Sequence, residues 1–472
     1  MSGKFNKVTN LLVKELRKIV GEKAVIYEDK EALEDYAIDE LVGDCYFHMP
    51  EVVLKPKNKK EISKIVKLAN KENIPITPRG AGSGLTGAAI PIYGGMVVSL
   101  ERMNKILEVD TKNLVAVTEP GVITNDLCES VSMEKLYYPG YPMSVETSFI
   151  GGNVATNAGG SKVIKYGNTG NHILGIEAVL PSGEIIQFGG KRRKDSSGYN
   201  FVKFLVGSEG TLAIFTKIFV NLVPMPGKTV DLLIPFEKIE DAVTNVSLMI
   251  TESGVLPTAI EYINKDSIAV GVKYNNINLP FQERAEAFLI VQFEGKNKEE
   301  LENVYEKAGL IAMKNGALDV FVADNRTASE KVWRIRKSNL EAIQVIDPYV
   351  PTGDIVAPTS AIGEMVEEIQ HISMECKVKI PIVGHAGDGN LHPAPMKPKD
   401  MGIEEGKKLA EIILDRIALK AVELGGAVSG EHGIGFIKKK ILSETKKKEI
   451  KLMKQIKDSW DPKNIMNPGK IF

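Results

Sequence analysis

The sequence predicts an α+β protein with two differently patterned regions, and three observations support this prediction. Up to about Pro226, short apolar strands alternate with two glycine-rich clusters, at residues 78–87 and 148–160. From Lys228 to about Gly425, longer helical patterns lie between strands. The length of 472 residues suits two or three domains, because a single hydrophobic core rarely grows beyond about 250–300 residues.

The composition is that of a soluble globular protein, with 43% apolar residues, 26% charged residues and a net charge of -1. This balance argues against a general nucleic-acid binder and against a polybasic membrane anchor. No apolar run approaches the ~18 residues that span a bilayer, and residues 1–20 predict an amphipathic surface helix. The cysteines, Cys45, Cys128 and Cys376, lie too far apart in sequence to form a CxxC pair or an iron–sulfur set, so the cytoplasm is the predicted location.

The first elements predict a β-α-β unit. Glu51–Leu54 is an apolar strand, and Asn58 begins a helix with Glu61 in capping-box spacing. The next strand, Ile74–Thr77, leads directly into the first glycine cluster. Further short strands are expected at 95–100, 106–110 and 114–118.

The first glycine cluster, Pro78–Gly87, contains four glycines and two hydroxyl side chains. Glycine favours neither helix nor strand, but it lets backbone N–H groups approach an anion closely. A Walker A loop would end in Gly-Lys-Ser/Thr, and no lysine follows here. A Rossmann loop would open a helix, whereas this chain runs into Pro91. The cluster is therefore a phosphate cradle of another kind or an ordinary glycine-rich turn.

Two further glycine segments follow. Residues 148–160 combine glycines with hydroxyl and amide side chains. Tyr166-Gly167, a strand-turn-strand pattern at 176–188, and the glycine turn 207–211 before a strand at 212–216 come next. The proline-rich step at 224–226 predicts the first domain boundary.

Four motifs in this order carry a family resemblance: PRGAGSGLTG, SFIGGNVATNAGG, YGNTGNHILGIEAVLPSGE and GSEGTLAIFT. They resemble the FAD-binding domain of the vanillyl-alcohol-oxidase-type flavoproteins. In that family the first two clusters hold the FAD pyrophosphate and flank the isoalloxazine ring. Members that bind flavin covalently often carry a histidine in the first loop. This chain has Ser83 there, so the resemblance implies non-covalent FAD.

The resemblance also implies the domain layout and the cofactor-binding residues. It predicts an FAD-binding domain at 1–226, a ferredoxin-like cap over the flavin ring at 227–425, and a C-terminal segment at 426–472 that returns to the FAD domain. Helical patterns at 239–251 and 298–315, with strands at 287–294 and 318–323, suit a split β-α-β cap. The residues near the C-terminus, including Asn467, resemble the terminal signature of the family. The implied FAD contacts are Pro78, Arg79, Gly80, Ala81, Gly82, Ser83, Gly84, Leu85, Thr86, Gly87, Ser148, Gly151, Gly152, Asn153, Thr156, Ala158, Gly159, Gly160, Tyr166, Gly167, Glu209, Gly210, Ile214 and Asn467.

Half of the six histidines lie close together in sequence, each beside a glycine or at a glycine turn. His385 and His392 flank a tight glycine turn, and Glu431 precedes His432. Two histidines and one carboxylate are the ligand set of an open divalent-metal site. The alternative is that each is a packed or surface residue, as a lone histidine usually is.

The segments GHAGDGNLH and GEHG resemble those of the FAD-linked dehydrogenases of D-2-hydroxy acids, which act on D-lactate, glycolate and D-2-hydroxyglutarate. The resemblance implies that His385, His392 and Glu431 bind one divalent metal ion and that His432 is the catalytic base. Zinc, iron(II) and manganese all accept such a ligand set. Arg336 matches the substrate-binding arginine of the group; without the resemblance it could equally be a surface helix arginine.

This assignment agrees with the chemistry of the reaction. Oxidising a 2-hydroxy acid removes a hydroxyl proton and a hydride from the same carbon. A divalent cation lowers the pKa of the hydroxyl group, and a neutral imidazole can then accept the proton. The hydride is expected to pass to flavin N5.

D-Lactate is the favoured substrate in this reading. Hydroxyglutarate enzymes carry a lysine in the segment aligned with Val350–Asp354, and this segment has none. Reduced FAD must pass its electrons on, and the family implies a hetero-complex with electron-transferring flavoprotein or with an iron–sulfur subunit. The alternatives are a glycolate oxidase flavin subunit with iron–sulfur partners and a non-catalytic flavin relay subunit.

Overall fold

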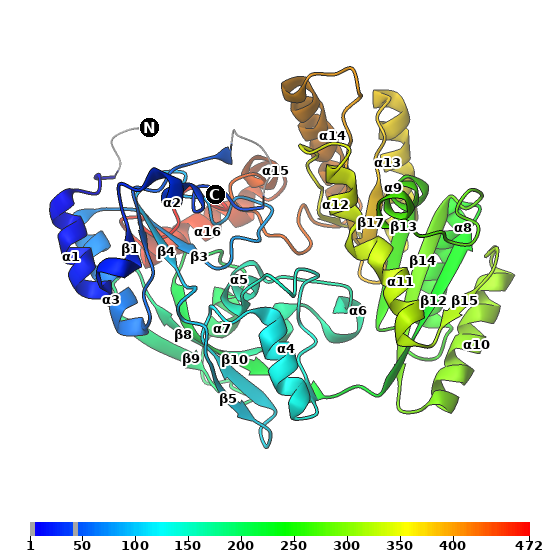
Figure 1. The fold of residues 1–472 in the computed structure, drawn as a ribbon, viewed down its shortest axis with the longest axis horizontal. Coiled ribbons are helices and arrows are strands. Elements are labelled where there is room, and N and C mark those ends of the chain that lie inside the picture. The colour runs from blue at the N-terminus through cyan, green and yellow to red at the C-terminus, as the bar shows by residue number, and fades with distance from the viewer. Residues whose placement is uncertain (1–4, 41–45) are drawn as a thin grey trace. The chain divides into compact units, whose positions relative to one another are not determined.

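The computed structural model describes residues 5–40 and 46–472. The first four residues of the predicted N-terminal helix and Cys45 lie outside these ranges. The chain forms two compact units. Unit 1 comprises Met1–Gly159, Asn168–Met225 and Glu431–Phe472, and unit 2 comprises Gly160–Gly167 and Pro226–Gly430. Figure 1 shows the elements of each unit, coloured along the chain.

Unit 1 contains a four-stranded sheet in the order β1-β2-β4-β3. Its strands are β1 (Val25–Ile26), β2 (Val52–Leu54), β3 (Ile76–Arg79) and β4 (Met96–Ser99). β4 pairs in parallel with both β2 and β3, and β1 pairs antiparallel with β2. Helix α3 (Lys59–Glu72) connects β2 to β3, so the predicted β-α-β unit is confirmed.

The capping box that the sequence predicts begins α3. The Asn58 side chain accepts a hydrogen bond from the Glu61 N–H at 3.0 Å. The Glu61 carboxylate reaches back and accepts one from the Lys57 N–H at 2.9 Å. One N–H group of the first helical turn and the N–H group of the residue before the N-cap are thereby satisfied.

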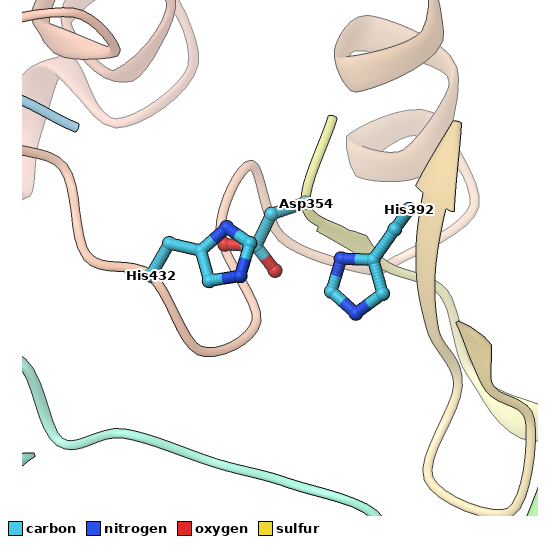
Figure 2. Close-up of side chains that lie close together, drawn as sticks. All are labelled: Asp354, His392 and His432. Atoms are coloured by element: carbon cyan, nitrogen blue, oxygen red, sulfur yellow. The ribbon is translucent and has the colours of Figure 1, made fainter. Parts of the chain in front are cut away.

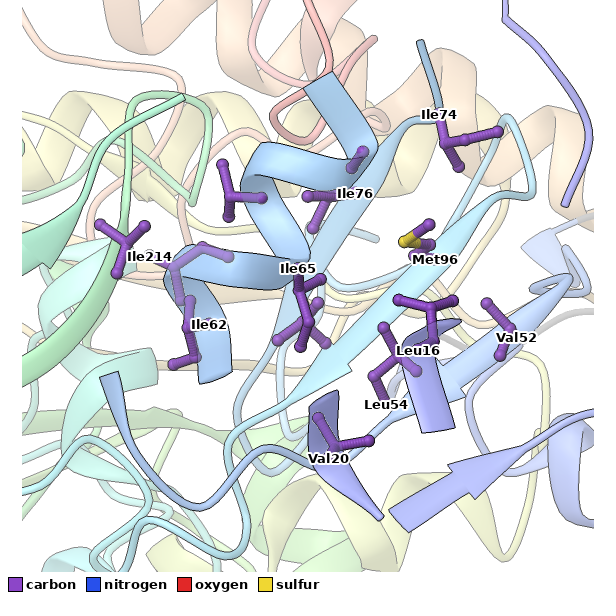
Figure 3. Packing of buried hydrophobic residues seen from close by; sticks show 14 of the residues in the cluster. Leu16, Val20, Val52, Leu54, Ile62, Ile65, Ile74, Ile76, Met96 and Ile214 are labelled. Atoms are coloured by element: carbon purple, nitrogen blue, oxygen red, sulfur yellow. The ribbon is translucent and has the colours of Figure 1, made fainter. Parts of the chain in front are cut away.

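The core of unit 1 forms where α3 and α1 (Asn10–Val20) pack on this sheet (Figure 3). Ile62 and Ile65 of α3 and Leu16 of α1 are completely buried. They pack with Leu54 of β2 and Ile76 of β3, which are also completely buried. This apolar face holds β3 in place, and the first glycine cluster begins at the end of β3.

The second sheet of unit 1 has five antiparallel strands in the order β5-β6-β10-β8-β9. These are β5 (Ile106–Asp110), β6 (Val115–Thr118), β8 (Ile173–Val179), β9 (Ile185–Gly189) and β10 (Ile214–Asn221). The second glycine cluster is partly helical, because α5 takes Ile150–Thr156. The other elements of unit 1 are η1 (Glu22–Ala24), α2 (Lys30–Glu34), α4 (Thr124–Met133), β7 (Leu136–Tyr137), η3 (Thr169–His172), α7 (Phe201–Leu205), β11 (Val223–Pro224), α15 (Lys439–Thr445) and α16 (Lys447–Trp460).

The first four strands of unit 2 have the ferredoxin-like arrangement that was predicted. β12 (Lys228–Phe236), β13 (Ala259–Asn264), β14 (Ala287–Gly295) and β15 (Phe321–Ala323) lie in the order β15-β12-β14-β13, all antiparallel. Helix α8 (Ile239–Thr251) connects the first pair in sequence and α10 (Lys298–Lys314) the second, which is the β-α-β-β-α-β pattern. Helix α9 (Lys265–Asn275) is an addition between β13 and β14.

Three more strands extend this sheet beyond β13. They are β17 (Ile382–His385), β18 (Asn390–Pro393) and β16 (Ile355–Val356), added in that order. The other elements of unit 2 are α6 (Val163–Tyr166), α11 (Arg326–Lys337), α12 (Asn339–Gln344), η4 (Thr359–Ala361), α13 (Ile362–Cys376) and α14 (Ile403–Glu423). Among the helices of the described residues, none has both the length and the apolar character that crossing a bilayer requires.

The short segment Gly160–Gly167 belongs to unit 2, although it continues the second glycine cluster in sequence. The Tyr166 hydroxyl donates a hydrogen bond to Glu294 at 2.5 Å, and Lys165 Nζ donates one at 2.9 Å. Because Glu294 lies at the end of β14, these bonds attach the segment to the sheet of unit 2.

Candidate active site

The two glycine clusters lie against each other within unit 1. The first forms a loop after β3, with positive φ at Gly82 (82°) and Gly87 (73°). A Cβ atom added to Gly80 would lie 3.6 Å from the Gly152 Cα, whereas one added to Gly152 would meet no heavy atom within 4 Å. The clusters therefore border open space with bare backbone. This is what close approach of a pyrophosphate requires, so these residues fit FAD.

Hydrogen bonds made by the side chains of Asp39 and Arg79 hold the loop of the first cluster in position. The Gly87 N–H donates a hydrogen bond to Asp39 Oδ2 at 3.0 Å. The Arg79 guanidinium donates to the Ile38 carbonyl at 2.6 Å and to the Asp35 carbonyl at 3.1 Å. Arg79 was predicted to contact FAD, and here its side chain supports the loop from the protein side.

The hydroxyl and amide residues of the second cluster form a buried network around Thr124. The Ser148 and Thr124 hydroxyls lie 2.9 Å apart, and Asn153 Nδ2 donates to the Thr124 hydroxyl at 2.7 Å. The Thr156 hydroxyl donates to the Gly152 carbonyl at 3.2 Å. These hydrogen bonds hold α5, in which Gly152 faces open space.

Glu209 and Asn467 connect the C-terminal segment to the first cluster within unit 1. The Glu209 carboxylate accepts hydrogen bonds from the Ile434 and Gly435 N–H groups, both at 2.7 Å. Burial raises the pKa of Glu209, and the two backbone donors act in the opposite direction. Asn467 Nδ2 donates to the Ala88 carbonyl at 2.9 Å and to the Glu209 carbonyl at 2.7 Å. Asn467 thus contacts the residue that follows the first cluster, and the Glu209 carboxylate holds the C-terminal segment at Ile434 and Gly435.

The other predicted FAD contacts are divided between the two units. Ala81, Ser83, Gly84, Leu85 and Thr86 lie in the first loop, and Ala158 and Gly159 follow α5. The Ile214 side chain is buried in the same core as α3, and Gly210 lies beside Pro78. Gly160, Tyr166 and Gly167 belong to unit 2. Their contact with FAD remains a prediction.

In unit 2 the predicted metal-binding histidines lie on adjacent strands. His385 ends β17 and His392 lies in β18, with a tight turn between them. Gly389 in this turn has a φ of 88°, and a Cβ there would lie 1.9 Å from the Ala357 carbonyl oxygen. Only glycine fits, so the turn brings the two imidazole centroids to 5.5 Å.

A buried carboxylate, Glu261, lies between His385 and Arg336. Its Oε1 accepts a hydrogen bond from His385 Nδ1 at 2.7 Å, and its Oε2 accepts one from Arg336 Nε at 2.6 Å. Burial alone would raise the pKa of Glu261, but His385 and Arg336 together hold it below its usual value. A proton on Nδ1 leaves His385 Nε2 as the nitrogen that can bind a metal ion.

A second buried carboxylate, Asp354, accepts hydrogen bonds from residues at the C-terminal end of unit 2. Its Oδ1 accepts hydrogen bonds from Asn390 Nδ2 and from the Gly430 N–H, both at 2.9 Å. Its Oδ2 accepts one from the Ser429 hydroxyl at 2.7 Å. Asp354 is 1% exposed. It therefore connects β18 to the last two residues of unit 2.

Glu431 and His432 follow Gly430 directly in sequence. The hydrogen bond from the Gly430 N–H to Asp354 therefore fixes the backbone just before these two residues. Within unit 2, the ligand atoms of His385 and His392 lie within 4.8 Å of each other. Glu431 as the third metal ligand stays a prediction. A carboxylate oxygen of Asp354, also in unit 2, lies within 4.8 Å of a ring nitrogen of His392 (Figure 2). The predicted donor set, two imidazoles and a carboxylate, fits a divalent ion with open positions.

Sequence reasoning missed Glu261 and Asp354. A glutamate within the otherwise apolar strand Ala259–Ile263 was an available signal, because a charged group in a buried strand needs a partner. Asp354 gave a weaker signal, since aspartate is common in loops. Its partners lie far from it in sequence.

Two protein families match most of this chain. Residues 50–189 match an FAD binding domain, and residues 225–471 match the C-terminal domain of FAD linked oxidases. The chain is 36% identical over 474 aligned positions to the D-lactate dehydrogenase of Anaerostipes hadrus, covering 99% of this chain and 98% of that protein. It is 39% identical over 428 positions to glycolate oxidase subunit GlcD of Bacillus subtilis, covering 90% of each.

A solved structure confirms the fold. p-Cresol methylhydroxylase with substrate bound has a TM-score of 0.80 to this chain at 17% identity, covering 98% of this chain and 96% of that one. It shares the vanillyl-alcohol-oxidase-type fold that the glycine motifs predict. This chain therefore belongs to the FAD-linked oxidases, as an FAD-dependent oxidoreductase of the group that contains D-lactate dehydrogenase and glycolate oxidase subunit GlcD.

Proposed function

We propose that the protein is an FAD- and divalent-metal-dependent dehydrogenase that oxidises D-lactate to pyruvate and passes the electrons to a partner protein. The observation that supports it most is the buried group Glu261, His385 and Arg336. In this group one carboxylate contacts both the imidazole proposed to bind the metal and the guanidinium proposed to bind the substrate. The relative from Anaerostipes hadrus carries the name D-lactate dehydrogenase.

Arg336 is the group proposed to bind the substrate carboxylate. It is 6% exposed, its Nε is held by Glu261, and its Nη2 has no hydrogen-bond partner in residues 5–40 and 46–472. A buried guanidinium nitrogen without a partner is costly, and an anionic ligand would satisfy it. A 2-hydroxy acid provides such an anion next to the reacting carbon.

His385, His392 and Glu431 would hold the cation, and His432 would accept the hydroxyl proton as a neutral imidazole. When bound, the cation supplies Lewis acidity toward the substrate oxygens, and FAD supplies the hydride acceptor. The Glu261 bond fixes the His385 tautomer. The Asp354 bonds set the start of the segment that carries Glu431 and His432.

The choice of a monocarboxylate rests on the segment Val350–Asp354. It contains no lysine that could bind a second carboxylate, and its one charged residue, Asp354, is occupied with Asn390, Ser429 and Gly430. A second candidate function is that of a glycolate oxidase flavin subunit, because the Bacillus subtilis relative has that name at 39% identity. The proposed acceptor is electron-transferring flavoprotein for the first function and an iron–sulfur subunit for the second.

Anaerobic flavin reduction tests the proposal. Purified protein with its FAD is mixed with D-lactate, L-lactate or glycolate, and bleaching of the flavin absorbance is followed with and without prior chelation. D-Lactate should reduce the flavin fastest, and a methyl pocket would favour it over glycolate by about 10–200-fold. Chelation should abolish reduction, and added Mn²⁺ should restore it. Faster reduction by glycolate would support the second candidate, and no reduction by any of the three would indicate a non-catalytic relay subunit.

A further inference from the structure

Glu261 is a single carboxylate that contacts two of the proposed site residues from inside unit 2. It lies in β13 and its exposed fraction is 0%. Its Oε1 is 2.7 Å from His385 Nδ1, and its Oε2 is 2.6 Å from Arg336 Nε. Each oxygen therefore orients one residue, and the two residues share one negative charge.

The contact with His385 is built into the sheet. β13 and β17 pair antiparallel with Glu261 directly opposite His385. Cross-strand partners project from the same face, so the side chains meet without any loop to adjust them. A carboxylate on Nδ1 fixes the imidazole ring plane and directs Nε2 to the other side, where a cation would bind.

The contact with Arg336 fixes the end of helix α11. Near the start of this helix, the Ser329 hydroxyl donates a hydrogen bond to Asp231 of β12. Trp333, one turn before the end, is buried against the sheet. Glu261 makes the last attachment through Arg336 Nε and so determines the direction of the remaining guanidinium nitrogens.

We infer that Glu261 is a positioning residue that supports both cation binding at His385 and recognition of the substrate carboxylate by Arg336. This inference rests on the proposed function and adds a residue to it. One charge orients both groups, so its removal should weaken both binding events together. By contrast, a change at Arg336 alone should leave cation binding nearly unchanged, because His385 keeps its own carboxylate oxygen.

The test compares three variants in the full-length holoenzyme. Glu261→Gln keeps the volume of the side chain but can accept a hydrogen bond on only one of its two terminal atoms. Arg336→Lys keeps the charge but removes the Nε contact. Glu177→Gln is the matched control, since Glu177 is also buried and accepts hydrogen bonds from Lys59 and Thr216 in unit 1.

Two quantities are measured for each variant. The Mn²⁺ dissociation constant of chelated protein is obtained by electron paramagnetic resonance of free Mn²⁺, and KM and kcat for D-lactate are obtained at saturating Mn²⁺. Glu261→Gln should raise the Mn²⁺ dissociation constant about 10–100-fold. It should also raise KM about tenfold, as expected for losing a hydrogen bond to a charged group. Arg336→Lys should raise KM only, with Mn²⁺ binding within about twofold of wild type, and Glu177→Gln should match wild type in both.

The decisive measurement is the KM of Glu261→Gln for D-lactate at excess Mn²⁺. The inference predicts that saturating Mn²⁺ restores metal occupancy while KM stays raised. Full recovery of KM, or Mn²⁺ binding equal to wild type, would overturn it. Flavin content and melting temperature verify folding. If Glu261→Gln does not fold, Glu261→Asp is measured in the same way, because it keeps the charge but cannot reach both partners.

Failure of the proposed function would give results that differ from those expected if only the role of Glu261 were wrong. Wild-type protein would then bind no Mn²⁺, or its flavin would not be reduced by D-lactate or glycolate, and the inference would fail with it. Normal wild-type behaviour with an unaffected Glu261→Gln variant would overturn only the role of Glu261.

Discussion

Replacing Asp354 should separate a positioning carboxylate from a metal ligand, because the structure allows both readings. A carboxylate oxygen of Asp354 lies within 4.8 Å of a ring nitrogen of His392, one of the proposed metal ligands. However, both of its oxygens already accept hydrogen bonds, from Asn390, Ser429 and Gly430. We expect Asp354 to act through these bonds and not as a ligand.

The magnitudes follow from the number of bonds lost. Each hydrogen bond to a charged acceptor contributes about 1.5–3 kcal/mol. Asp354→Ala removes three, and water can enter the space left behind and satisfy part of the donors, so a loss of about 3–5 kcal/mol in the stability of unit 2 is expected. Asp354→Asn can keep its oxygen toward Gly430 and Asn390 and donate to the Ser429 hydroxyl. Its cost should be about 1 kcal/mol.

Tryptophan fluorescence can follow the unfolding of unit 2 by itself, because the two tryptophans lie in different units. The chain has two, Trp333 in unit 2 and Trp460 in unit 1. In a Trp460→Phe background, urea unfolding followed by fluorescence reports on unit 2 through Trp333. Flavin reduction by D-lactate is measured in parallel and should stay within about tenfold of wild type for Asp354→Asn. A folded Asp354→Asn variant that no longer binds Mn²⁺ would refute the positioning role and identify Asp354 as a ligand.

Three other predictions concern the flavin, the base and a buried lysine. Gly152→Leu should fold with an unchanged melting temperature of the apoprotein but purify without yellow colour, since its side chain would enter open space beside the first cluster; full flavin content would contradict this. His432→Ala should keep Mn²⁺ binding and slow flavin reduction about 10²–10⁴-fold, whereas Glu431→Ala should lose Mn²⁺ binding first. If excess Mn²⁺ restored flavin reduction in His432→Ala, His432 would orient the metal and not act as the base. Burial lowers the pKa of Lys470 to about 7, so between that pH and the ordinary lysine pKa the unfolded chain holds a proton that the folded chain lacks. Stability of unit 1 should therefore rise with pH in this window, by at most about 1.4 kcal/mol per pH unit. Lys470→Met should remove this rise, and a difference in melting temperature from wild type that does not vary with pH would count against it.

Local sequence determined the elements whose causes lie within a few residues. The Asn58–Glu61 capping box starts α3 as predicted, because both partners are on the same turn. The first glycine cluster forms a loop after β3, since glycine tolerates the positive φ at Gly82 and Gly87. The alternation of helices and strands suited a ferredoxin-like cap, and the strand order of unit 2 agrees with it.

The tertiary structure decided the contacts between residues far apart in sequence. Tyr166 was assigned to the FAD domain by its motif, yet its hydroxyl bonds to Glu294, so its segment belongs to unit 2. Glu261 meets His385 only because β13 pairs with β17 in one register, and a shift by one residue would turn the carboxylate to the opposite face of the sheet. Periodicity along the chain reveals that Glu261 lies in a strand. Which strand lies beside it, and in which register, depends on the packing of the whole unit, and that packing gave the predicted histidine its carboxylate partner.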